Sequence, residues 1–171
     1  QRRTDRFELA KGFPESIYVF CLYEDQAGVI WAGTIGHGLY FYNPKTGATG
    51  NFVYDARNPQ GLSSNSVSGI SEDSEQQLWI STEGGGVCRL DKDRYHFTRF
   101  NTDSGLPGNM VYKVLEDKNK QLWISTSRGL ARYNPARNSW KIYTQAHGLL
   151  TDQFNYSSGY RDSSGTLYFG S

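Results

Sequence analysis

The chain has 171 residues, and its 18 basic and 17 acidic side chains nearly balance. This balance argues against a nucleic acid or an anionic membrane recruited by bulk electrostatics. No run of apolar residues approaches the ~20 that a membrane-spanning helix needs. Aromatic residues make up 15% of the chain and glycine occupies 19 positions, a composition typical of short strands joined by tight turns.

The start of the chain, residues 1–5, reads Gln-Arg-Arg-Thr-Asp and lacks an initiator methionine. This polar start is unlike a secretory signal peptide, so we expect the chain to be a piece of a longer protein. A strand-like run follows at residues 7–9. It precedes Gly12 by the same spacing that separates Tyr143 from Gly148, which predicts that it is the last strand of a preceding repeat unit.

A repeat dominates the rest of the chain. An aromatic anchor recurs at separations of 48, 44 and 45 residues, with an aspartate six residues before each anchor and a Gly-apolar pair earlier still. The anchors are Trp31, Trp79, Trp123 and Tyr168; the aspartates are Asp25, Asp73, Asp117 and Asp162; the pairs are Gly12-Phe13, Gly61-Leu62, Gly105-Leu106 and Gly148-Leu149. A period of ~40–50 residues with four strands per unit is typical of β-propeller blades.

The unit 105–147 shows the pattern most clearly. Strand-like runs are expected at residues 110–116, 121–125, 129–133 and 139–144, joined by turn-forming sequences, and no helix is expected anywhere. We therefore predict an all-β fold, a partial β-propeller of just under four blades that spans residues 1–171. Residues 1–12 would end a preceding blade, 13–57, 62–103 and 106–146 would be complete blades, and 148–171 would be partial.

The repeated residues have structural explanations. Each anchor ring is expected to be largely buried in the wedge between neighbouring blades, and each aspartate to accept a hydrogen bond from the backbone N–H two residues on. Cys21 and Cys88 are interpreted as small buried apolar residues rather than as a disulfide. The run Gly84–Gly86 lets the chain turn; it is not followed by the Lys-Ser/Thr of a phosphate-binding loop.

Two stretches carry a resemblance to a known family. GLSSNSVSGISEDSEQQLWISTEGGGVCRLDKD (61–93) and GLPGNMVYKVLEDKNKQLWISTSRGLARYNP (105–135) resemble two-component regulator propeller repeats. The resemblance implies the periplasmic or extracellular sensor region of a membrane-anchored hybrid two-component histidine kinase, a family that responds to polysaccharide breakdown products. The outer units depart from the pattern: the first has one additional residue before Asp25, and the last has two before Asp162.

Candidate ligand-binding residues lie in the connections that share one face of a propeller, those from fourth to first strand and from second to third strand. Residues that vary there between blades, on a constant frame, suit a binding face. The candidates are His37, Glu83 and Arg128 in the second-to-third connections, and Asn65, Asn109 and Asp152 in the fourth-to-first connections; Ser127, Asp103 and His147 are further loop members. Arg128 could bind a carboxylate or sulfate, while Asn65, Asn109 and Asp152 also suit tight turns.

Three classes of function remain open: a sensor module that binds an oligosaccharide or other small ligand, a passive propeller scaffold, and a propeller-fold lyase or glycoside hydrolase. Catalysis of the last kind needs paired acids on one face, and the loop acids Glu83, Asp103 and Asp152 fall in different units. The three histidines show no metal-ligand spacing. We expect no catalytic residue, metal or cofactor in this chain.

The expected partners are the remaining blades and the downstream kinase of the parent chain, together with an oligosaccharide or other small ligand and no nucleic acid. A fragment of a propeller also leaves strand edges and blade faces uncovered, which predicts self-association of the chain.

Overall fold

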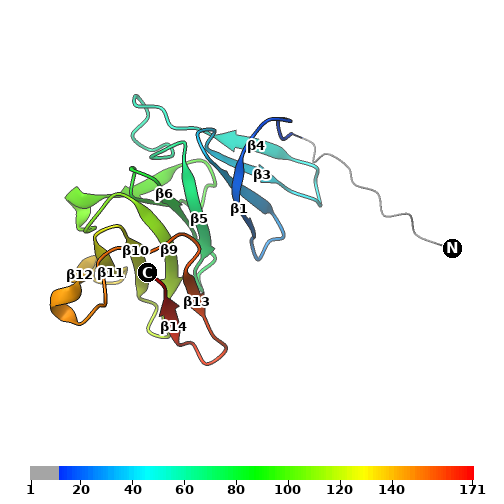
Figure 1. Cartoon of the computed structure of the whole chain (residues 1–171). Coiled ribbons are helices and arrows are strands. Elements are labelled where there is room, and N and C mark those ends of the chain that lie inside the picture. The colour runs from blue at the N-terminus through cyan, green and yellow to red at the C-terminus, as the bar shows by residue number, and fades with distance from the viewer. Residues whose placement is uncertain (1–11) are drawn as a thin grey trace.

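The structure, a computed structural model, describes residues 12–171 as three four-stranded antiparallel sheets followed by a two-stranded one. Within each sheet the strands pair in chain order, so every sheet is a meander, the form of a propeller blade (Figure 1). The expected all-β propeller fold is confirmed. The strand expected near residues 7–9 lies outside the described residues.

The strand bounds follow the repeat. Blade 1 contains β1 (Val19–Glu24), β2 (Ile30–Thr34), β3 (Leu39–Tyr42) and β4 (Thr49–Phe52). Blade 2 contains β5 (Val67–Glu72), β6 (Leu78–Thr82), β7 (Val87–Leu90) and β8 (Phe97–Phe100). Blade 3 contains β9 (Val111–Glu116), β10 (Leu122–Thr126), β11 (Gly129–Asn134) and β12 (Ser139–Tyr143). Blade 4 contains β13 (Gly159–Arg161) and β14 (Leu167–Phe169).

Two single-turn 3₁₀-helices, η1 (Thr102–Ser104) and η2 (Gln145–His147), correct the expectation that no helix occurs. Both lie in fourth-to-first connections. The side chain of Asn101 caps η1 by accepting hydrogen bonds from the backbone N–H groups of Asp103 and Ser104. Such local capping stabilises one turn without the apolar periodicity by which a longer helix is recognised.

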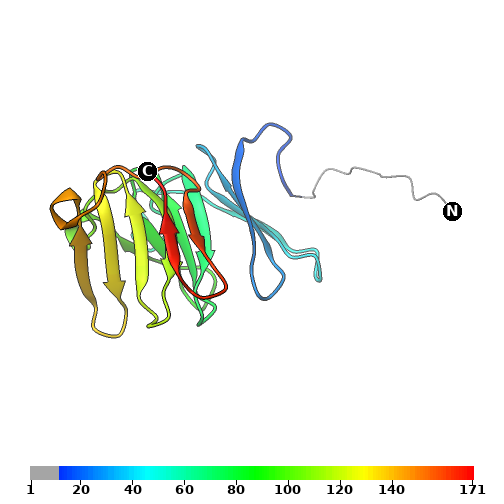
Figure 2. The ribbon, with the colours of Figure 1, turned by 60° about the horizontal axis from the view of Figure 1, so that its bottom comes forward.

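The blades form an open arc. The first strands β1, β5, β9 and β13 are neighbours in that order along the inner side of the arc, and the later strands extend outward from them (Figures 1 and 2). We call the line that these first strands surround the axis. The second-to-third and fourth-to-first connections lie at one end of the blades, here called the upper face.

The core lies between blades. Trp31 packs against Phe41 and Phe52 of its own blade, and Phe52 meets Phe97 of blade 2 with ring centroids 5.1 Å apart. Trp79 packs against Phe100 of its own blade and contacts Tyr133 of blade 3. Both cysteines are free thiols, as expected; Cys88 is buried and Cys21 is half-buried. Burial raises the pKa of the Cys21 thiol to about 11.

The anchor rings occupy equivalent places, but their burial falls along the chain. Trp31 and Trp79 are 3% and 2% exposed, Trp123 is half-buried, and Tyr168 is 54% exposed. The expectation that all four are largely buried is therefore wrong for Tyr168. Each ring is covered by the blade that follows its own, and no described strand follows blade 4.

Each complete blade has a register irregularity in its first strand. The pairing with the second strand skips one residue in each case, and the skipped residues are Phe20, Ser68 and Tyr112. They occupy the same place in the repeat, five residues before the repeated aspartate of each unit. A bulge of this kind re-aims a side chain, so these three positions break the alternation of the first strand.

Candidate functional site

The four repeated aspartates are parts of a structural couple. In blades 1–3 one carboxylate oxygen accepts hydrogen bonds from backbone N–H groups two and four residues on, which confirms the expected turn role. The other oxygen accepts from the anchor indole Nε1, at 2.9 Å for Asp25–Trp31 and 2.8 Å for Asp73–Trp79 and Asp117–Trp123. In blade 4 the Tyr168 hydroxyl donates to Asp162 at 3.3 Å.

The environment of Asp25 fits this role. Burial by itself would raise its pKa, but hydrogen bonds from Trp31 and Val29 and the nearby Arg94 guanidinium, 3.1 Å away, lower the pKa below its ordinary value. The carboxylate is thus held ionised and fully engaged. It is not available as a general acid or as a metal ligand.

A second contact joins neighbouring blades and was not foreseen. The carboxylate of Glu72, at the end of β5, accepts a hydrogen bond of 2.9 Å from the backbone N–H of Gln26 in blade 1. Glu116, at the equivalent place in blade 3, accepts from the backbone N–H and the hydroxyl of Ser74 in blade 2, both at 2.9 Å. Blade 4 has Arg161 at this position and so cannot repeat the contact.

On the upper face, Asn65, Asn109 and Asp152 hold the connections together. Their backbone carbonyls accept hydrogen bonds from Gly38, Gly86 and Gly129 of the preceding second-to-third turn. Their side-chain oxygens accept from the backbone N–H groups of Tyr54, Thr102 and Gln145 at 2.7, 2.9 and 2.6 Å. The oxygens of these three candidates are therefore engaged in holding the connections of the upper face, and a ligand would have to compete for them.

The other three candidates differ in their surroundings. His37 is exposed, with its Nδ1 3.1 Å from the carbonyl oxygen of Ile35, and Arg128 is exposed on the β10–β11 turn. Glu83 is half-buried, and its carboxylate acts on the hydroxyl of Tyr156. Interaction with the Glu83 carboxylate, together with burial, raises the pKa of Tyr156 to about 12.

Tyr156 brings the four blades together at the axis. Its ring meets Phe20 of β1 edge-on at 5.3 Å and Tyr112 of β9 edge-on at 4.7 Å. Phe20 and Tyr112 are the bulge residues of their strands, and Tyr156 lies in the segment that carries the two additional residues of the last unit. We call Phe20, Glu83, Tyr112 and Tyr156 the axial cluster. Of its members, sequence reasoning found only Glu83, although the irregular spacing of the outer units was a usable signal.

A larger hollow of about 670 Å³ lies at the opposite end of blades 2 and 3. Its walls include Asp73, Arg89, Asp91 and Lys120, so both signs of charge are represented. Arg89 takes the place that the ring of Phe41 fills in blade 1, and its guanidinium contacts Asp91 at 3.3 Å and Thr98 at 3.1 Å. These mutual contacts make it a less open site than the axial cluster.

Within residues 12–171, no group of three or more His, Cys, Asp or Glu side chains is arranged to hold a metal ion. Neither of the helices in this part of the chain is long and apolar enough to cross a membrane.

Fold and site define a segment of propeller blades with a shared inner face. Comparison with known families specifies the type: the model of the two component regulator propeller matches residues 12–36, 61–84 and 105–128. Each of the three complete blades therefore contains one stretch that matches this repeat model.

The chain is similar to larger proteins, of which it spans a small part. It is 28% identical to a histidine kinase P4 of Formosa agariphila, over 98% of this chain and 16% of the relative. Its structure is similar to the extracellular domain of a putative hybrid two component system of B. thetaiotaomicron, with a TM-score of 0.74 and 29% identity over 96% of this chain and 22% of that one. A virginiamycin B lyase of Staphylococcus aureus shares the fold alone, with a TM-score of 0.64 and 14% identity over 90% and 48%.

Proposed function

We propose that the chain is an extracellular sensor segment of a membrane-anchored hybrid two-component histidine kinase, and that its upper face binds a carbohydrate. The observation that carries this proposal is the similarity to an extracellular domain of a hybrid two component system over 96% of the chain. The three matched propeller repeats support it. The remaining blades and the kinase of the parent chain would transmit the signal across the membrane from its periplasmic or outer side.

The axial cluster supports a carbohydrate as the ligand. Aromatic rings bind the apolar faces of sugars, and a half-buried carboxylate such as Glu83 can accept hydrogen bonds from sugar hydroxyl groups. His37 and Arg128 lie on turns of the same face and extend the proposed site. Asn65, Asn109 and Asp152 contribute by fixing the turns from which these side chains project.

Binding of the 171-residue chain to a panel of plant, algal and host oligosaccharides tests the proposal. We expect one saccharide class to bind, and Tyr156→Ala to weaken it about 10-fold, because a hot-spot aromatic commonly contributes that much. Tyr95→Ala is the matched control, since Tyr95 is 75% exposed on the β7–β8 connection at the opposite end of blade 2.

The other two classes of function predict different results in the same assay. A passive scaffold would bind no saccharide. An enzyme would degrade one, and loss of that turnover in a folded Glu83→Gln variant would overturn our expectation that the chain has no catalytic residue.

A further inference from the structure

Next to the axial cluster, one cationic side chain lies between the first strands of blades 3 and 4. Lys113 follows the bulge residue Tyr112 on β9, and its aliphatic stem lies against β13 of blade 4. A Cβ atom on Gly159 would lie 2.6 Å from Cγ of Lys113, so the absence of a side chain at Gly159 makes room for the lysine.

Within the described residues, no carboxylate lies within ion-pair distance of the Lys113 ammonium group. Among residues 12–171, two other cations pair with a carboxylate of another blade: Arg94 with Asp25 at 3.1 Å and Lys120 with Glu75 at 3.0 Å. Lys113 makes no ion pair within this part of the chain, although it is half-buried.

Burial removes water from the ammonium group of Lys113. Cys21 is the titratable group that acts on it, and that thiol is neutral at physiological pH because burial raises its pKa to about 11. Burial lowers the pKa of Lys113, as expected for an ammonium group that has lost water without gaining an anion. An anion supplied from outside would restore the lost interaction.

A cavity leads to this group. It has a volume of about 270 Å³, and its walls include Phe20, Ser68, Tyr112, Lys113 and Ser157. Three of these wall residues are the bulge residues of β1, β5 and β9, so the irregularity of the first strands forms the cavity. Aromatic walls and a single cation are the features of a site for a sugar that carries an acidic group.

We propose that the axial cavity binds the acidic group of a saccharide, a uronate carboxylate or a sulfate ester, and that Lys113 is its counter-ion. The inference rests on the proposed function for the ligand class and adds the charge of the ligand and the residue that recognises it. The rings of Phe20 and Tyr112, which line the cavity, would border the sugar.

Binding of matched acidic and neutral sugars tests this assignment. The probes are α-1,4-digalacturonate against α-1,4-galactobiose and 6-sulfolactose against lactose, measured by calorimetry on the 171-residue chain and on Lys113→Met. In the unsubstituted 171-residue chain, the acidic sugar of at least one pair is expected to bind about 10-fold more tightly than the neutral sugar. This is the scale of a hydrogen bond to a charged group. In Lys113→Met that preference should fall below about 2-fold.

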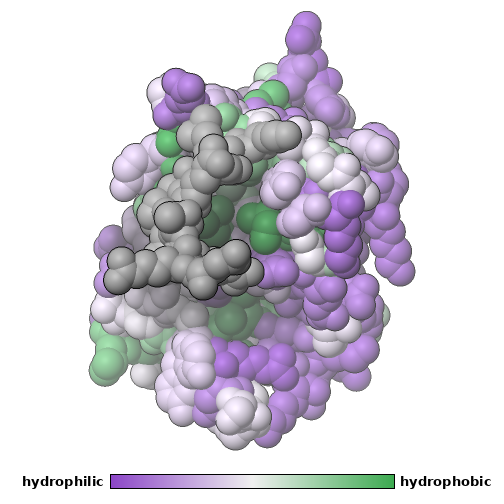
Figure 3. Space-filling view, turned by 90° about the vertical axis from the view of Figure 1, so that its right-hand side faces the viewer, coloured by the Kyte–Doolittle hydropathy of each residue, from purple (hydrophilic) through white to green (hydrophobic). Residues whose placement is uncertain are grey.

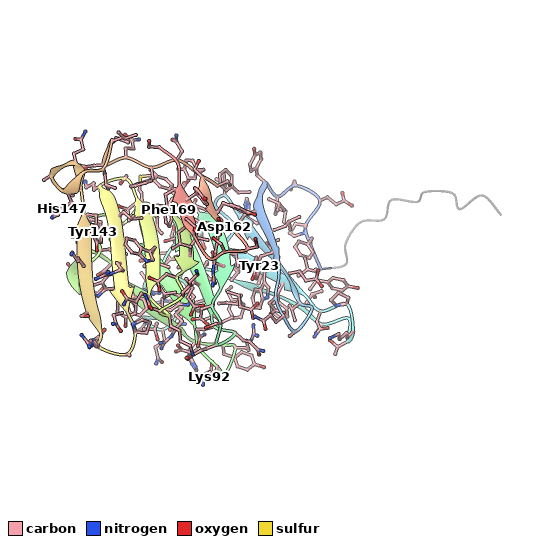
Figure 4. The ribbon with its side chains drawn as sticks, turned by 90° about the horizontal axis from the view of Figure 1, so that it is seen from below. Tyr23, Lys92, Tyr143, His147, Asp162 and Phe169 are labelled. Carbon is pink, nitrogen blue, oxygen red and sulfur yellow. The ribbon has the colours of Figure 1, made fainter. Side chains whose placement is uncertain are left out.

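The variant and its control separate charge from folding. Methionine keeps the stem that lies against Gly159, and an unchanged melting temperature verifies that the fold persists. Lys92→Met removes an exposed lysine from the β7–β8 connection, which does not line the cavity, and should leave the preference intact. Figure 4 labels both Lys92 and Tyr23, a residue of the cavity wall on β1.

Two outcomes would overturn the assignment: no acidic probe is preferred, or the preference survives in Lys113→Met. If neutral sugars bind without an acidic preference, the assignment fails and the proposed function stands. If no saccharide in the panel or the probe set binds, both fail.

Discussion

At the scale of single residues, the couple between an aspartate and an anchor ring recurs in every blade, but its burial differs. Asp25 and Trp31 are both 3% exposed, whereas Tyr168 in blade 4 is 54% exposed. A buried indole N–H without an acceptor costs more than an exposed hydroxyl without one, since water replaces the acceptor only at the surface. The same hydrogen bond is therefore worth different amounts in different blades.

This difference predicts the effect of removing the carboxylate. Asp25→Asn should lower the free energy of unfolding by about 2 kcal/mol, because an amide N–H would then face the indole N–H of Trp31. A double-mutant cycle with Trp31→Phe should show a coupling of about 1–2 kcal/mol in urea denaturation. Asp162→Asn is the control and should change stability by less than about 0.5 kcal/mol. Equal losses at Asp25 and Asp162 would contradict the structural role.

How much of the site the sequence predicts also depends on distance along the chain. The turn contacts of the aspartates were predictable because the acceptor and the donors lie within four residues. The ring contacts of Tyr156 with Phe20 and Tyr112 were not, since they join segments far apart in the sequence through the curvature of the arc. The burial of Tyr168 was mispredicted because the repeat implies a neighbour for every ring, and blade 4 has none in the described chain.

At the scale of elements, the second-to-third turns are tied to both neighbouring strands. Gly86 has φ +79°, its N–H donates to the carbonyl of Asn109, and a Cβ atom there would lie 2.1 Å from the carbonyl oxygen of Phe100. Gly84, two residues earlier, has φ +84° but no atom within 4 Å of its Cβ position. Gly84 is thus required only for its backbone conformation, whereas Gly86 is required both for its conformation and because a side chain would collide with β8.

Alanine substitutions separate these two requirements. Gly84→Ala should lower stability by about 1 kcal/mol, the cost of a left-handed conformation for a residue with a side chain. Gly86→Ala should cost at least about 2 kcal/mol more, because the β6–β7 turn must also move away from β8. Thermal and urea denaturation of the two variants measure the difference. Indistinguishable variants would show that the close approach of Gly86 to Phe100 is relieved without cost.

At the scale of the whole molecule, the two ends of the arc expose surfaces that the interior blades bury. Leu22 in blade 1 is 68% exposed, whereas Ile70 at the equivalent place in blade 2 is 4% exposed. At the other end, Tyr160 and Tyr168 are 65% and 54% exposed. Figure 3 shows apolar side chains among polar ones on the end of the molecule that includes blade 1.

These two ends are complementary by construction. Within the chain, the face that carries an anchor ring packs against the face that carries Ile70 in the next blade. Leu22 in blade 1 is the equivalent of Ile70. Blade 1 of a second copy could therefore pack against the exposed ring of Tyr168 as blade 2 packs against Trp31 within the chain. Head-to-tail association of two copies would cover both ends without any new type of contact.

Sedimentation equilibrium of the 171-residue chain tests most directly whether it is an open arc with uncovered end faces. We predict reversible association with a dissociation constant on the order of 1–100 µM, as expected for small interfaces. Tyr168→Glu should weaken this association at least about 10-fold, because it places a charge in the contact. The matched control Tyr95→Glu should not change it. A monomer at all concentrations up to about 100 µM, with Tyr168 protected from solvent, would contradict the open arc.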